Sequence, residues 1–200
     1  MKCMTSVIIF CACAFMNKVI VVGGYTKGNS TNSCLQFDTR NYIWKEVSSM
    51  DVARATRACA VFEERIVVCG GCDNPRLNTV ESYDVLPDKW SPMPSLNFSK
   101  NVSSLVVVKH KLFVISKRKD SCEVYDNVCK RFIAIKSPRF NLFSGIRANA
   151  IENKIFAFQD DLSKIITYDS QKNEWSEELC GVTKNLNFFT SVNVPSLYEH

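Results

Sequence analysis

The chain has 200 residues, of which 46% are hydrophobic and 22% charged, a composition that excludes disorder as its main state. Lys and Arg number 25 against 20 Asp and Glu, and the net charge of +5 falls short of a dedicated nucleic-acid-binding protein. Only two histidines, His110 and His200, are present, which disfavours metal sites and histidine-based catalysis.

The chain begins with a short apolar run, residues 7–14, that follows Lys2 and ends in an Ala-x-Ala pattern. This arrangement resembles a secretory signal peptide. Three glycosylation sequons, which begin at Asn29, Asn97 and Asn101, would suit a secreted glycoprotein. No apolar run reaches the length that is needed to span a bilayer, so a transmembrane helix is not expected.

An internal repeat follows this run. The sequence KVIVVGG at residues 18–24 recurs as RIVVCGG at residues 65–71, at an offset of 47. The basic residue and the apolar run recur twice more, at residues 111–115 and 154–158, without the glycine pair. Self-similarity at a period of this size is typical of repeat architectures.

A second landmark follows each run: an aromatic residue, an aspartate and, six residues after the aspartate, a large aromatic ring. The four members are Phe37-Asp38 with Trp44, Tyr83-Asp84 with Trp90, Tyr125-Asp126 with Phe132, and Tyr168-Asp169 with Trp175. The last rings are spaced by 46, 42 and 43 residues, which is within the range of propeller blades. We expect these positions, together with Gly23, Gly24, Gly70 and Gly71, to be structural.

Each unit is expected to form four short strands, because β-branched and aromatic residues are concentrated in its apolar runs. In the second unit the expected strands are residues 57–62, 65–69, 80–84 and 89–93. The glycine pair would end the second strand, where the backbone approaches a neighbour closely or takes positive φ. The aspartate would open the turn after the third strand, because its carboxylate can accept from backbone amides one or two residues on.

This pattern of Gly-Gly, Tyr-Asp and a following Trp resembles the kelch motif, and the match extends from Thr5 to about Glu178. The resemblance implies an all-β fold: a kelch-type β-propeller of about four four-stranded blades, complete or incomplete, formed by a single region over residues 1–200. The units are residues 5–56, 57–101, 102–145 and 146–182, and the tail, residues 183–200, resembles the start of a fifth unit. The cysteine-rich and Asn/Lys-rich style also resembles the kelch part of poxviral BTB-kelch proteins.

The repeat favours a second interpretation of the N-terminal run. At the offset of 47, residues 12–15 fall on residues 59–62, in the expected first strand of the second unit. Cleavage after Ala14 would remove the corresponding strand of the first unit from its blade. We therefore expect a strand here in preference to a signal peptide.

The residues that could carry chemistry do not form a recognisable site. Kelch-like copper oxidases need converging imidazoles, whereas His110 is expected in the turn between the first two strands of the third unit, away from His200. The ten cysteines lie largely in apolar runs, and the one C-x-x-C, Cys69 to Cys72, lacks a second ligand pair for zinc. The aspartates recur once per unit, which favours a turn role over glycoside hydrolysis. We expect no enzyme activity, metal or cofactor, and a reducing compartment, the cytoplasm.

The remaining candidate site is a surface. In a propeller, the loops between the second and third strands and the loops between blades share one face. Here these loops are residues 25–33, 72–79, 117–121 and 160–164 within units and residues 51–57, 97–103 and 137–147 between units, and they carry 11 basic and 5 acidic residues. The arginines expected to bind a partner are Arg54, Arg57, Arg76, Arg118, Arg139 and Arg147.

The partner that these arginines suit is an acidic protein, because a guanidinium fork matches carboxylates. Few aromatic residues are interleaved with the basic residues of these loops, which disfavours nucleic acid, and no membrane contact is expected. The alternative is that the basic loops are only solvated.

These features predict a non-enzymatic protein-protein interaction module. In BTB-kelch proteins the propeller captures a substrate, while BTB and BACK regions dock a cullin ubiquitin-ligase scaffold. We expect neither region in this chain, and therefore substrate capture without direct cullin binding, in the cytoplasm of the host cell if the protein is viral. The alternatives are a truncated, largely non-functional remnant of a longer viral BTB-kelch protein, since two units lack the glycine pair, and a secreted glycoprotein or kelch-type oxidase.

Overall fold

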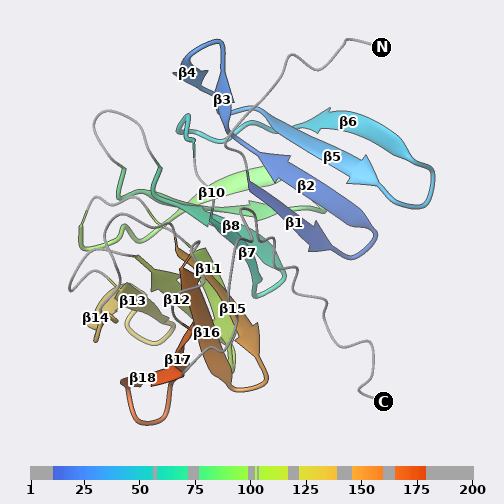
Figure 1. Ribbon diagram of the computed structural model, residues 1–200. Coiled ribbons are helices and arrows are strands. Elements are labelled where there is room, and N and C mark those ends of the chain that lie inside the picture. Colours follow the sequence, from blue (N-terminus) through green and yellow to red (C-terminus); the bar gives the residue numbers. More distant parts are fainter. Residues whose placement is uncertain are drawn as a thin grey trace.

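The computed structural model describes residues 11–55, 58–71, 77–98, 102, 104–116, 122–138, 146–159 and 165–178. These residues form four four-stranded antiparallel sheets and one short hairpin (Figure 1). The all-β fold with one four-stranded sheet per unit is confirmed, and each sheet is called a blade below. The described residues include no helix of the length and apolar character that crossing a membrane requires.

The strands of each blade follow one another along the chain. Blade one contains β1 (Cys11–Phe15), β2 (Lys18–Val22), β5 (Cys34–Asp38) and β6 (Ile43–Val47), and blade two contains β7 (Cys59–Phe62), β8 (Arg65–Cys69), β9 (Val80–Asp84) and β10 (Lys89–Met93). Blade three contains β11 (Ser104–Val108), β12 (Lys111–Ile115), β13 (Cys122–Asp126) and β14 (Arg131–Ile135), and blade four contains β15 (Ile146–Ile151), β16 (Lys154–Gln159), β17 (Ile165–Asp169) and β18 (Glu174–Glu178). Three expected strands of the second unit match residue for residue. The remaining strand, the first of the unit, was expected over residues 57–62 and is described from Cys59 to Phe62.

The N-terminal apolar run contains a strand, as the repeat predicted. Phe15 at the end of β1 pairs with Lys18 at the start of β2. Phe62 at the end of β7 pairs with Arg65 at the start of β8 in the same way. The first strand of blade one and its copy in blade two therefore share one register.

Two-residue turns join the first and second strands and set this register. Glu63 and Glu64 have φ of 48° and 59°, and Lys109 and His110 have φ of 48° and 56°. Two successive left-handed residues are the geometry that matches the twist of a tight hairpin. His110 therefore lies in the turn of blade three where the sequence predicted it.

The repeated aspartates open the turn after the third strand, as expected. The Asp126 carboxylate accepts the backbone N–H groups of Val128 at 2.8 Å and Cys129 at 2.9 Å, and Asp38 accepts that of Arg40 at 2.8 Å. These backbone donors hold the pKa values of Asp126 and Asp38 below their ordinary value. The corresponding bonds run from Leu86 to Asp84 at 3.3 Å and from Gln171 to Asp169 at 2.8 Å.

The hydrophobic core lies between successive blades. Along β8, Ile66 and Val68 belong to the cluster shared with blade one, whereas Val67 and Cys69 belong to the cluster shared with blade three. The alternation follows from the pleat, which sends successive side chains to opposite faces. A third cluster joins blades three and four. The first strands β1, β7, β11 and β15 are neighbours in that order (Figure 1).

Candidate protein-interaction face

Loops of two kinds meet at one end of the blades. The carbonyl of Thr31, in the loop between β2 and β5, accepts the backbone N–H of Arg54, in the segment between blades one and two, at 3.2 Å. Met50 donates its backbone N–H to the Asn32 carbonyl at 3.0 Å, and the Asn32 side-chain amide donates to the Met50 carbonyl at 2.9 Å. Within-blade and between-blade loops therefore share a face, as expected. We define this loop face by its described residues, 23–33, 48–55, 70–71, 77–79 and 94–98.

The same pair of hydrogen bonds recurs in blade two. Leu96 donates its backbone N–H to the Asn78 carbonyl at 2.9 Å, and the Asn78 side-chain amide donates to the Leu96 carbonyl at 3.3 Å. Asn78 and Leu96 follow Asn32 and Met50 by 46 residues. Sequence reasoning missed these asparagines, although their recurrence at the blade spacing was a readable signal.

A small hairpin stands on the loop face of blade one, where β3 (Tyr25–Thr26) pairs with β4 (Asn29–Ser30) (Figure 1). Lys27 and Gly28 have φ of 49° and 84°, the left-handed pair that a two-residue hairpin turn requires. Residues 25–33 connect the second and third strands of blade one, as expected, and the hairpin within them was not predicted. Gly28 permits its turn at little steric cost. Lys27, Gly28 and the residue that follows are exposed.

Arg54 belongs to the loop face but not to its surface. Its side chain is 0% exposed, and its guanidinium donates to the carbonyl oxygens of Gly70 at 2.9 Å and Thr79 at 3.1 Å and pairs with the Glu81 carboxylate. The other Glu81 oxygen accepts the backbone N–H of Asp51 at 2.8 Å. The prediction that Arg54 binds a partner was wrong, because its guanidinium is buried and bonds to acceptors of blade two. The pair joins blades one and two.

Both glycine pairs lie against Arg54, the first against its backbone and the second against its side chain. Gly24 donates its N–H to the Arg54 carbonyl at 3.0 Å. A Cβ at Gly23 would lie 2.3 Å from that carbonyl oxygen, and a Cβ at Gly71 would lie 3.2 Å from the Arg54 Cβ. Gly23 and Gly70 also have φ of 58° and 62°. Close approach and positive φ, the two reasons expected for these glycines, are both present.

The other arginines predicted for this surface have different outcomes. Arg147 is the second residue of β15 and is partly buried, so its predicted place in a loop over residues 137–147 was wrong. Within the described loop face, the exposed basic residue is Lys27. Four further candidates lie outside the described residues: Arg57, Arg76, Arg118 and Arg139.

Two members of the aromatic series, Trp90 and Trp175, link their blades to the preceding one. The Trp90 indole N–H donates to the carbonyl of Ser48, directly after β6, at 2.8 Å, and the ring lies 4.9 Å from that of Tyr83 between centroids. Trp175 donates in the same way to the carbonyl of Lys136, directly after β14, at 2.7 Å. The corresponding ring distances are 5.0 Å for Phe37 and Trp44, 5.1 Å for Tyr125 and Phe132, and 4.9 Å for Tyr168 and Trp175.

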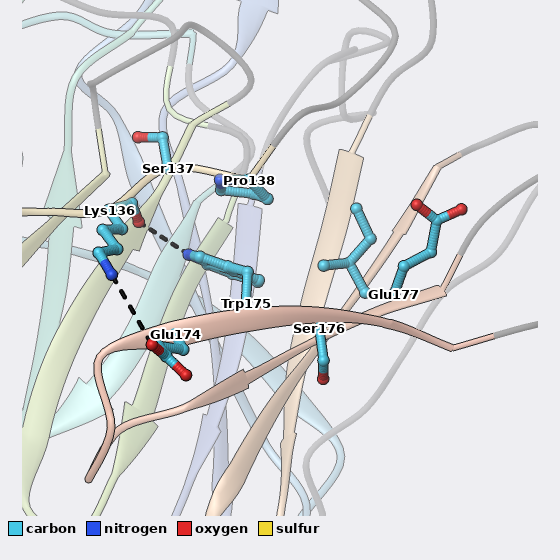
Figure 2. Close-up of a pocket in the computed structure, with 8 residues that line it drawn as sticks. Lys136, Ser137, Pro138, Glu174, Trp175, Ser176 and Glu177 are labelled. Carbon is cyan, nitrogen blue, oxygen red and sulfur yellow. Dashed lines mark hydrogen bonds and ion pairs between the residues drawn. The ribbon is translucent and has the colours of Figure 1, made fainter.

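A groove of about 460 Å³ lies at the junction of blades three and four (Figure 2). It is lined by Lys136, Ser137, Pro138, Ile166, Glu174, Trp175, Ser176 and Glu177. Figure 2 shows Glu174 and Trp175 directed toward Lys136, whose ammonium lies 3.9 Å from the Glu174 carboxylate. The lining contains neither histidine nor cysteine, so it does not pair a nucleophile with an imidazole base.

The titratable groups of the described blades serve contacts between and within them. The Tyr83 hydroxyl donates to Asp88 at 2.6 Å, and this bond lowers the pKa of Asp88, while burial raises the pKa of Tyr83. Across the described ranges, His, Cys, Asp and Glu side chains do not gather in groups of three or more that could hold a metal ion. The arrangement offers a surface for recognition built on a hydrogen-bonded scaffold.

The Kelch motif family matches residues 10–51 and 53–97, which span blades one and two. This part of the chain is therefore similar to two kelch motifs. The chain is 35% identical over 99 residues to F-box/kelch-repeat protein At1g22040 of Arabidopsis thaliana, covering 46% of this chain and 21% of that protein. It is 25% identical over 189 residues to Kelch-like protein 35 of Mus musculus, covering 87% of this chain and 32% of that protein.

These similarities show distant homology to kelch-like and F-box/kelch proteins. The chain spans between about a fifth and a third of the length of these relatives, at 21% and 32%. One of these relatives comes from a plant and the other from a mouse. The resemblance to poxviral proteins stays a prediction.

Proposed function

We propose that this chain is a non-enzymatic module that captures a protein partner through its loop face, as the kelch part of a BTB-kelch ubiquitin-ligase adaptor captures a substrate. Kelch repeats typically bind proteins. The observation that carries the proposal is the β3–β4 hairpin, whose tip is exposed on the face where the two kinds of loop are bonded together. A loop ordered before binding loses less conformational entropy when the partner docks.

The proposed partner presents an acidic segment. Lys27 lies at the exposed hairpin tip, while the buried Arg54 is excluded from the contact. The remaining basic candidates, Arg57, Arg76, Arg118 and Arg139, stay part of the proposal because cationic side chains match carboxylates. We place the interaction in the cytoplasm, because the described cysteines are free thiols, as in proteins of reducing compartments.

The test is capture of proteins from a cell extract by three immobilised forms: wild type, Lys27→Glu and Lys109→Glu. Lys109 is exposed in the β11–β12 turn, at the end of the blades opposite the loop face, so its reversal makes the same charge change elsewhere. We expect a protein that is retained by wild type and Lys109→Glu, retained severalfold less by Lys27→Glu, and released by salt. Equal retention by the two variants would reject the hairpin as the docking element.

A second arm tests the arginines. Reversal of Arg76 and Arg118 together is expected to weaken capture of the same protein while the thermal unfolding transition stays in place. Unchanged capture would reject the basic part of the proposal and leave the hairpin contact standing.

A further inference from the structure

Two cysteine thiols meet where blade one adjoins blade two. Cys13 is the third residue of β1 and Cys59 is the first residue of β7, and these two first strands are neighbours. The Cys13 thiol donates to the Cys59 sulfur at an Sγ–Sγ distance of 2.9 Å. A further approach of about 1 Å would bring the sulfurs to the disulfide bond length of about 2.05 Å.

We propose that Cys13 and Cys59 are the site of a reversible disulfide that joins blade one to blade two when the protein meets a peroxide. The thiolate of one cysteine attacks a peroxide oxygen and becomes a sulfenic acid, and the hydroxide that leaves takes up the proton lost by the thiol and becomes water. The second thiol then attacks the sulfenic sulfur, forms the S–S bond and releases a second water. Two thiols and one hydrogen peroxide thus give one disulfide and two waters, and a dithiol reductant reverses the reaction by exchange.

The surroundings of the pair allow this reaction and slow it. Cys13 and Cys59 are both partly exposed, so a small peroxide can reach them, whereas Cys11 on the same face of β1 is buried. The hydrogen bond to Cys59, and then burial, raise the pKa of Cys13 well above its ordinary value. The ionisable groups that shift the pKa of Cys59 are thiols as well, namely Cys11, Cys13 and Cys69. Because the thiolate is the reactive form, oxidation is slow at neutral pH and accelerates as pH rises.

The disulfide would restrain blade one, which has one neighbouring blade, blade two, among the described residues. Residues 13 and 59 are separated by 46 positions, and the segment between them contains β2 to β6, most of blade one. Closing a loop of this length removes conformational freedom from the unfolded chain. The oxidised protein should therefore unfold at a temperature higher by roughly 5–10 °C.

The experiment treats the full chain with hydrogen peroxide at mildly alkaline pH, blocks the remaining thiols and maps linked peptides by mass spectrometry. We expect a Cys13–Cys59 linked peptide and a raised Tm, both reversed by dithiothreitol. Cys13→Ser should lose both signals. Cys129→Ser is the matched control, because Cys129 is an exposed thiol in the turn after β13, and it should keep both.

Three outcomes would overturn the proposal. One is the absence of a Cys13–Cys59 peptide from the folded wild type, and another is a Cys59 bridge to Cys11 in its place. The third is complete bridging with an unchanged Tm. If Cys13→Ser does not fold, Cys13→Ala and the peptide map of wild type decide the question.

Discussion

Blades one and two carry the best-matched repeats, yet they bury the same repeat positions to different extents. Trp90 in blade two is 7% exposed, whereas its counterpart Trp44 in blade one is 47% exposed. Trp90 reaches the carbonyl of Ser48 on the blade before it, while in the described structure blade one comes first. The burial of a repeat position is therefore set by the neighbouring blade as much as by the repeat itself.

The second strands show the same difference. In β8, the four residues after Arg65 are all buried, because blades cover both of its faces. In β2, only Ile20 and Val22 are fully buried, since the described core covers one face. Blade two thus has the environment of a central element, and blade one that of an edge element.

The largest effect is expected at the joint that the two blades share. Glu81→Ala would leave the Arg54 guanidinium buried without its carboxylate and should lower the free energy of unfolding by about 4 kcal/mol. Arg65→Ala is the control, because it breaks the exposed pair with Asp84 at 3.7 Å and should cost less than about 1 kcal/mol. Urea denaturation midpoints measure both, and equal shifts would mean that the buried pair does not join the blades.

The two tryptophans test the comparison directly. Trp90→Ala should cost about 3 kcal/mol, because it empties a buried site and removes the bond to Ser48. Trp44→Ala should cost about 1 kcal/mol, because half of that ring already faces solvent. Thermal or urea unfolding of the two variants gives the difference. Equal losses would show that another element covers Trp44 in solution.

Two glycines of blade one, Gly23 and Gly28, allow the cost of a close contact to be measured apart from the cost of positive φ. Gly23→Ala should cost about 2 kcal/mol or more, because the new Cβ would meet the Arg54 carbonyl oxygen in addition to the unfavourable φ. Gly28→Ala should cost about 1 kcal/mol, since φ is 84° there but the surrounding space is open. Unfolding midpoints compare the two. If Gly23→Ala lowers the free energy of unfolding less than Gly28→Ala does, the backbone at Arg54 moves to accommodate the new Cβ.

The smallest effect concerns pH. The Tyr83 hydroxyl, followed by the Ser48 backbone N–H, lowers the pKa of Asp88, so this stabilisation is complete above the unfolded-state pKa near 3.9 and is lost as pH falls through the folded-state value. Because Asp88 is largely exposed, the contribution should stay below about 1 kcal/mol. Asp88→Asn should reduce the acid sensitivity of the Tm.

Blade four supplies the natural control for this change. There, Asn173 occupies the equivalent turn position and accepts the Tyr168 hydroxyl at 2.9 Å. Asn173→Asp should add acid sensitivity of the same sign. If neither variant alters the pH profile of the Tm, ionisation of the residue that accepts the tyrosine hydroxyl does not affect stability.

Local patterns were sufficient to predict the strands and turns. The aspartate at the end of each third strand bonds amides two residues on, which depends on neighbours in sequence alone. The β3–β4 hairpin was missed because Lys-Gly is a weaker hairpin signal than Asn-Gly. Its detection required the backbone.

The candidate site was less predictable, because arginine suits a solvated loop and a buried ion pair equally well at the level of residue type. Arg54 was assigned to the surface, and only the position of Glu81, on the next blade, shows that it points inward. The meeting of Cys13 and Cys59 was equally hidden, since 46 residues separate them.

The amino-acid sequence by itself determined the repeat, the number of units, the strand register and the positions of the glycine pairs. These properties follow from side-chain alternation and turn chemistry within one unit. Only the tertiary structure decided which copies of a repeated residue are buried, where Arg54 directs its charge and which thiols touch. These properties depend on the neighbouring blade, whose contacts are long-range and leave no local pattern.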